Sequence, residues 1–194
     1  MSGHMSGTLA TEATRRRLTA RQADTVRRLT EAGVEEVRES GYENLSIRDV
    51  ARRAGVAPAT AYTYFGSKDH LLAEIFWRRL SALPPVGDGD DATNRRARVI
   101  AVLRELALLV SEEPELAAGC TAAMFGSEPD VRQLRLYIGK QIHERIETAA
   151  GRGSPQGRLL ELAFFGAMVE AGLGYTTYEH VADRLAEAAE LIMD

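Results

Sequence analysis

Hydrophobic residues recur at three- and four-residue spacing along most of this chain, which is the spacing of one face of an α-helix. The pattern predicts helices over residues 19–40, 46–54, 58–65, 68–83, 93–111, 114–125, 129–149, 155–176 and 178–193. No segment alternates apolar and polar positions in a way that convincingly predicts a strand, and no internal repeat of fixed period occurs. The expected fold class is therefore all-α.

The segment 46–68 differs from the other helical segments in its boundaries. Ser46 is placed to cap one short helix, and Gly55 follows its last apolar position, where a left-handed C-terminal cap is common. Proline opens the next short helix, Pro58–Phe65, whose surface is rich in small residues, hydroxyls and tyrosines. Two short helices joined by a tight turn predict a helix-turn-helix. The alternative is a helical hairpin inside a bundle, but such a helix would carry a wider apolar stripe.

The segment Gly41–Leu72, GYENLSIRDVARRAGVAPATAYTYFGSKDHLL, resembles the DNA-binding region of TetR-family transcriptional regulators. The turn, the tyrosines and the Phe-Gly-Ser-Lys run all fall in the family's order. The resemblance implies an N-terminal three-helix DNA-binding domain and a C-terminal helical bundle that binds an effector and dimerises. Ala61 departs from the family, which usually has a larger aliphatic residue there. Thr30 and Glu36 stand where the first helix is usually apolar.

The resemblance also implies which side chains meet double-stranded DNA. Base or phosphate contacts are implied for Pro58, Ala59, Thr60, Tyr62 and Tyr64, and phosphate contacts for Ser46, Arg48 and Lys68. Base reading and backbone positioning are not separated by the residues alone. Upstream, the run Arg15–Arg17 with Arg21 is either an arm that contacts the backbone or minor groove, or a solvated leader.

Charge is divided unevenly along the chain. The net charge is −4, yet residues 1–80 hold 13 Lys+Arg against 10 Asp+Glu, giving +3. Residues 81–194 hold 11 against 18, giving −7. The basic half contains the helix-turn-helix, and a local basic surface matters more for phosphate binding than the total charge does.

These boundaries predict three regions. Residues 1–18 are expected to be a disordered arm, of which 1–4 resemble an expression-vector remnant. Residues 19–67 are expected to form the helix-turn-helix domain, and residues 68–194 the helical effector-binding and dimerisation domain. A segment rich in proline, glycine and aspartate, Ser81–Ala92, predicts a loop inside the second region.

The last two predicted helices carry apolar residues suited to self-association. The expected dimer interface comprises Leu159, Leu162, Gly166, Val169, Leu185 and Ala189. Apolar residues on more than one face of the helix 155–176 indicate burial on more than one side. The alternative is that the core of one monomer covers both faces. The family resemblance favours a twofold homodimer, which suits a palindromic operator.

Bulky, adaptable side chains in the second region are candidates for an apolar ligand pocket. They are Leu103, Leu106, Met124, Phe125, Tyr137, Phe164, Met168 and Tyr175. For any one of them the alternative is simple core filling, and the pocket itself is implied by the family. The segment Pro114–Arg135 resembles the body of actinobacterial regulators of lipid and sterol catabolism, which favours a small hydrophobic effector of acyl or sterol-like type.

The chain shows no constellation for catalysis, a cofactor or a metal. The four histidines are not spaced as ligands, and Cys120 has no nearby candidate base in the sequence. A single cysteine and no long apolar run suggest a cytoplasmic protein without a membrane segment. We expect a ligand-responsive transcriptional repressor. The alternatives are an effector-independent activator or architectural DNA-binding protein, and a helical enzyme.

Overall fold

The computed structural model describes residues 19–87 and 92–193, and the side chains of all these except 92–94. These residues form helices and no strands, so the all-α prediction is confirmed. The helices are α1 (Ala20–Asn44), α2 (Ile47–Arg53), α3 (Pro58–Tyr64), α4 (Lys68–Ala82), α5 (Ala92–Ala107), α6 (Pro114–Phe125), α7 (Pro129–Ala150), α8 (Pro155–Gly172) and α9 (Tyr178–Ile192). The expected arm, residues 1–18, lies outside the described residues. None of the described helices is both long and apolar enough to span a membrane.

Hydroxyl caps start several of these helices where the sequence places them. The Ser46 hydroxyl accepts from the Asp49 amide at 3.1 Å, and the Ser67 hydroxyl accepts from the His70 amide at 3.1 Å. Three predicted helix ends differ from the structure. Helix α1 runs to Asn44, across a non-helical Gly41, rather than ending at 40. Helix α5 ends at Ala107 rather than 111, and α8 ends at Gly172 rather than 176. After α8 the chain turns through Gly174, whose φ of 78° lies in the left-handed region that glycine adopts without strain.

We call α1–α3 with the first half of α4 the head. Its core is apolar and includes Val26, Leu29, Val50 and Phe65, all at most 1 % exposed. The two polar residues in α1 that depart from the family pattern have local partners. The Thr30 hydroxyl donates to the Val26 carbonyl at 3.1 Å, and Glu36 pairs with Arg53 of α2 at 2.8 Å.

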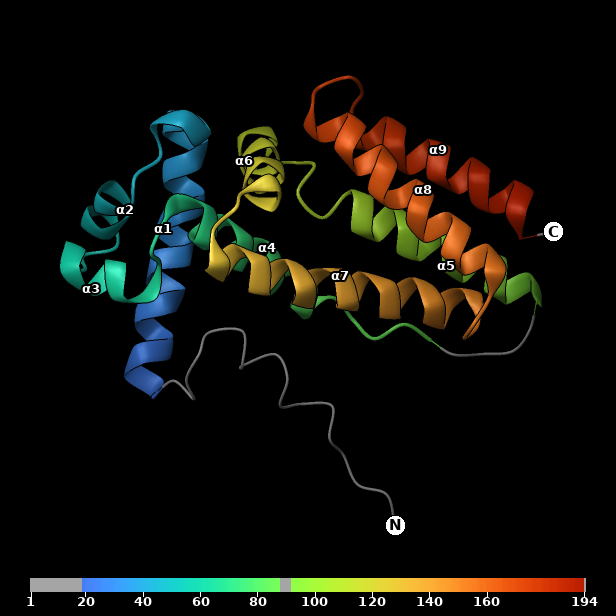
Figure 1. The fold of residues 1–194 in the computed structure, drawn as a ribbon, viewed down its shortest axis with the longest axis horizontal. Coiled ribbons are helices and arrows are strands. Elements are labelled where there is room, and N and C mark those ends of the chain that lie inside the picture. Colours follow the sequence, from blue (N-terminus) through green and yellow to red (C-terminus); the bar gives the residue numbers. More distant parts are fainter. Residues whose placement is uncertain (1–18, 88–91, 194) are drawn as a thin grey trace, which may run out of the picture.

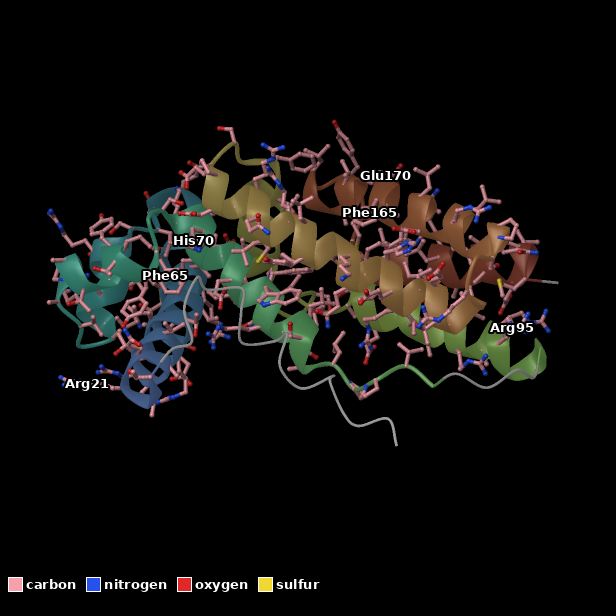
Figure 2. All side chains as sticks on the ribbon, turned by 60° about the horizontal axis from the view of Figure 1, so that its bottom comes forward. Arg21, Phe65, His70, Arg95, Phe165 and Glu170 are labelled. Atoms are coloured by element: carbon pink, nitrogen blue, oxygen red, sulfur yellow. The ribbon has the colours of Figure 1, made fainter. Side chains whose placement is uncertain are left out.

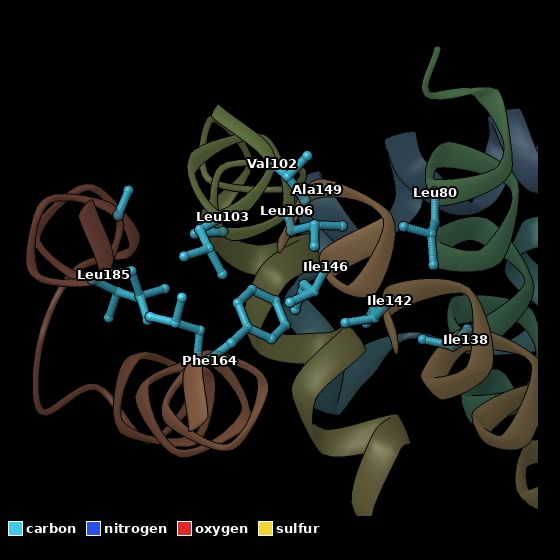
Figure 3. Packing of buried hydrophobic residues seen from close by; sticks show 14 of the residues in the cluster. Leu80, Val102, Leu103, Leu106, Ile138, Ile142, Ile146, Ala149, Phe164 and Leu185 are labelled. Atoms are coloured by element: carbon cyan, nitrogen blue, oxygen red, sulfur yellow. The ribbon is translucent and has the colours of Figure 1, made fainter. Parts of the chain in front are cut away.

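The remaining helices form the body, a bundle in which α5 contacts α7 and α9 while α8 contacts α7 and α9. Figure 1 shows the head at one end and the bundle at the other, with α4 and α6 between them. Leu103, Ile146, Phe164 and Leu185 meet in the centre of the bundle (Figure 3). Each side chain comes from a different helix, so the four helices share one apolar core.

Helix α4 belongs to both cores. Leu71 and Leu72 pack in the head, whereas Trp77 and Leu80 pack in the body. Helix α6 lies against the same joint, because a Cβ on Gly119 would stand 2.9 Å from the Leu72 side chain. Only a glycine allows that approach without displacing a buried neighbour. Head and body are therefore joined by buried apolar contacts rather than by a linker.

A second joint lies at the corner between α3 and α4. His70 packs edge-on against Phe65 (Figure 2), with ring centroids 5.5 Å apart. The Nδ1 atom of His70 stands 4.0 Å from the Asp130 carboxylate of α7. Ser67 donates a hydrogen bond to Glu128, just before α7. Burial lowers the pKa of His70, although Asp130 and Glu128 oppose that shift. Helix α3 is thus followed at once by a contact with the body.

This burial predicts a pH-dependent stability. Because the pKa of His70 is lower in the folded protein, the unfolded chain takes up the proton more readily. The stability associated with neutral His70 is present above its ordinary pKa near 6.5 and is lost as the pH falls below that value. We expect the free energy of unfolding to fall between about pH 7.5 and about pH 5.5, and to fall less in His70→Gln. Urea titrations at both pH values measure this; an equal fall in both proteins would contradict it.

Candidate nucleic-acid interface and effector cavity

The second helix of the helix-turn-helix faces outward. Along α3, Pro58, Ala59, Thr60 and Tyr62 are exposed, and Tyr62 is 51 % exposed. The opposite face is held by Ala61, which is fully buried in the head core. A larger residue at this position would need more room beside α2. The small Ala61 therefore seats α3 close to the head while the exposed face stays free for a major groove.

The α2 flank supplies a cation and a helix cap. The Ser46 hydroxyl already has hydrogen-bond partners within the protein, because it caps α2 and also donates to the Asp49 carboxylate. Arg48 is exposed, and no carboxylate in the described part of the chain pairs with it. Arg52, by contrast, pairs with Asp49 at 2.8 Å. Arg48 is thus the α2 side chain with the most freedom to reach a phosphate.

Lys68 is placed differently from the expected phosphate contact. Its ammonium donates to the Tyr42 carbonyl at 2.8 Å and the Glu43 carbonyl at 3.2 Å, and lies 4.1 Å from the centre of the Tyr42 ring. A cation here neutralises the negative C-terminal end of α1. Lys68 therefore ties α4 to α1, and its predicted phosphate contact stays a prediction. Tyr64 is half-buried and packs against the head core.

The body contains an apolar cavity of about 310 Å³ between α6, α7 and α8. Four of the expected pocket residues line it: Met124, Phe125, Phe164 and Met168. Lining residues that the sequence reading missed include Phe76, Cys120, Thr121, Arg135, Ile138, Gly139 and Tyr178. Their positions in the sequence look like ordinary core or surface positions of a helix, so only the approach of helices from separate parts of the chain reveals them.

The other four expected pocket residues lie elsewhere. Leu103 and Leu106 are buried in the bundle core, where α5 meets its neighbours. The Tyr137 ring lies against Trp77, with centroids 6.0 Å apart. Tyr175 is 81 % exposed, because α8 ends before it. These four are corrected: apolar character alone did not distinguish core and surface from cavity lining.

The polar groups of the cavity are few. The Thr121 hydroxyl and the Tyr178 hydroxyl share a hydrogen bond of 3.2 Å. Burial raises the pKa of the Cys120 thiol to about 12, which keeps it protonated and unreactive at neutral pH. Among the described residues no group of His, Cys, Asp and Glu is arranged to hold a metal ion. The cavity is therefore built to enclose an apolar group.

The outer face of α8 carries an apolar stripe, which we define as Leu159, Leu162, Gly166, Val169 and Leu173. Leu162 is 73 % exposed, and the first three members together with Leu173 face outward. Val169 is half-buried at the cavity. The expected contributions of α9 are corrected, because Leu185 and Ala189 are buried within their own protomer.

An outward recognition helix mounted on a helical body with an apolar cavity defines a DNA-binding regulator. Residues 29–75 match the model of the bacterial regulatory proteins of the tetR family. An uncharacterized HTH-type transcriptional regulator of Mycobacterium tuberculosis is 47% identical over 177 residues, which covers 89% of this chain and 82% of the relative. The chain belongs to the TetR family, and it is a transcriptional regulator rather than an enzyme.

Solved structures share this fold. A TetR regulator from Rhodococcus sp. RHA1 superposes with a TM-score of 0.70 at 22% identity, covering 90% of this chain and 97% of the other. The Bacillus subtilis regulator FadR, solved in complex with stearoyl-CoA, has a TM-score of 0.57 at 18% identity and covers 87% of this chain and 97% of its own. At these identities the likeness shows the fold alone.

Three substitutions separate the roles at the interface. Arg48→Ala should weaken binding to all DNA and reduce the salt dependence by about one counterion, with unchanged stability.

Thr60→Ala should weaken operator binding more than random-DNA binding if its hydroxyl reads a base edge. Lys68→Ala should lower both stability and DNA affinity, because α4 loses its bond to α1.

Fluorescence anisotropy at several salt concentrations, paired with thermal unfolding, measures all three. If Lys68→Ala keeps the wild-type stability and reduces the salt dependence as Arg48→Ala does, Lys68 acts at a phosphate rather than through the fold. Equal losses on operator and random DNA for Thr60→Ala would exclude base reading by that side chain.

Proposed function

We propose that this protein is a homodimeric repressor whose affinity for a palindromic operator is lowered by a small hydrophobic effector. Residues 19–67 would read the DNA, while residues 68–194 would bind the effector and dimerise. Acyl and sterol-like molecules are the candidate classes. The observation that carries the proposal is the position of the cavity against α4 and α6, because both helices also contribute side chains to the core of the head.

The cavity and the head share residues. Ala117 and Cys120 of α6 line the cavity and are also buried in the core of the head. Phe76 of α4 lines the cavity as well, one residue beyond Ile75 in the head core. A ligand that expands the cavity would press on α6 and α4, and these helices contact α1. Close-packed interiors shift as units rather than deform smoothly, so pressure here would move the head.

The size of the cavity limits the ligand. A volume of about 310 Å³ lies at the lower end of the range for small-molecule sites. It suits a short acyl chain or part of a larger apolar body. FadR has a similar fold and was solved in complex with stearoyl-CoA, which supports an acyl-type ligand by analogy of fold only. A coupling of about 1–3 kcal/mol between the sites would change operator affinity about 5- to 150-fold.

Dimerisation through the α8 stripe would place two heads on one operator. The three- and four-residue spacing of the stripe puts its members on one face of the helix. In a twofold dimer that face would pack against the same face of the partner. Gly166 at its centre would let the two backbones approach closely. Recognition helices of such dimers enter major grooves about 34 Å apart, and that spacing is what an effector would disturb.

Filling the cavity tests the effector role. Gly139 lines the cavity, and apart from its chain neighbours and its own helix backbone no atom lies within 4 Å of where its Cβ would stand, so Gly139→Phe adds an aromatic side chain to the lining with open space at its Cβ. We expect unchanged operator affinity and no release by decanoate or cholate, whereas the wild type is released at least about fivefold. Anisotropy on an operator selected from random DNA measures this. No release of the wild type by either probe would favour the effector-independent alternative for these classes.

Charge on the stripe tests the dimer. Leu162→Glu should convert the dimer to a monomer and sharply weaken operator binding, because a carboxylate would be buried at the twofold axis. Leu136→Glu is the matched control, since Leu136 is a 62 % exposed leucine on α7, away from the stripe. Sedimentation velocity measures both proteins. A Leu162→Glu dimer of wild-type stability would contradict this interface.

A further inference from the structure

The cavity lining contains one charged side chain among the described residues, Arg135 of α7. The others are apolar, except for Thr121, Tyr178 and Cys120. Thr121 and Tyr178 already satisfy each other at 3.2 Å, and the Cys120 thiol is directed to the Leu72 carbonyl at 3.7 Å. Arg135 is therefore the polar group of the cavity with unused binding capacity.

The partners of Arg135 are neutral. Its Nη1 donates to the Met124 carbonyl at 2.7 Å and to the Gly126 carbonyl at the end of α6. Across the part of the chain that the structure describes, no carboxylate forms an ion pair with Arg135, and its Nε and Nη2 donate to no acceptor. A guanidinium carries five N–H donors in a fixed fork, which matches the two oxygens of a carboxylate.

The environment favours an anion over a neutral acceptor. Arg135 is half-buried beside an apolar space, where a cation without a counter-ion is costly. It also lies toward the rim, because the Gly126 that it contacts adjoins Phe125, whose side chain is 65 % exposed. A ligand lying in the cavity could thus place an anionic end at the guanidinium and its apolar body among Ile142, Phe164 and Met168.

We infer that the effector is an amphiphile with a carboxylate head, which Arg135 binds in a charge-assisted hydrogen bond. This inference rests on the proposed effector function of the cavity and narrows its chemistry. Because Nη1 is bound to the α6 carbonyls, a carboxylate on the remaining donors would be tied through Arg135 to the C-terminal end of α6. Helix α6 packs against α1 and α4, so this tie would add to the pressure on the DNA-binding end of the protein.

A pair of ligands that differ only in the head tests the inference. We expect the wild type to bind decanoate at least about tenfold more tightly than 1-decanol by isothermal titration calorimetry at neutral pH. Arg135→Gln should bring decanoate affinity down to that of 1-decanol and leave 1-decanol unchanged. The control Arg132→Gln, an exposed position one turn earlier on α7, should keep the wild-type preference.

The outcomes separate the two proposals. Equal wild-type affinity for decanoate and 1-decanol overturns the carboxylate inference and leaves an apolar effector site standing. A preference that survives in Arg135→Gln also overturns it. Failure of the folded wild type to bind either ligand overturns the short-chain acyl effector, and the inference with it. The comparison of ligands on the wild type requires no variant, so loss of folding in Arg135→Gln leaves it decisive.

Discussion

The structure depends on the burial of α4 from both sides. Its first half packs Leu71 and Leu72 into the head, and its second half packs Trp77 and Leu80 into the body. A helix whose opposite ends belong to two cores cannot tilt without loosening at least one of them. The Lys68 ammonium fixes the same helix to the carbonyls that end α1. Position of the recognition helix is thereby linked to packing in the body.

The cavity gains its importance from this joint. Its wall includes residues of α6 that are also part of the head core, and Phe76 of α4. In the mechanism that we propose, a ligand would act on the DNA-binding surface by two routes, one through apolar pressure on α4 and one through the end of α6, to which Arg135 is hydrogen-bonded. Both helices contact α1. An effector needs only different contacts in two arrangements of this joint to shift operator occupancy.

Local signals predicted most of the helices. The elements were identified by the hydroxyl cap at Ser46, by prolines at helix starts and by apolar periodicity, because these signals depend on neighbouring residues only. Helix ends were predicted less well, because the periodicity of apolar residues does not show a turn such as the one at Gly174. The exposed face of α3 also agreed with the sequence reading, since its apolar stripe is narrow.

Long-range contacts could not be predicted in the same way. Lys68 finds its acceptors at Tyr42 and Glu43, far earlier in the chain, and only the fold brings them together. The apolar spacing of Leu185 and Ala189 on α9 is the same whether the helix faces the core of its own protomer or a partner, so the sequence does not distinguish the two. Nothing in the sequence sets Arg135 apart from an arginine on the surface of a helix, and its place in the cavity lining arises from the approach of α6 and α7.

The most direct test of the shared joint is native-state hydrogen exchange across increasing denaturant. If α4 unites head and body, the slowest amides of α1, α4 and α7 should open with one free energy and one denaturant dependence, because none of these cores survives without the others. Opening of the α1 and α2 amides at a clearly lower free energy, with a smaller denaturant dependence than α7, would show an independently unfolding head and contradict coupling through α4.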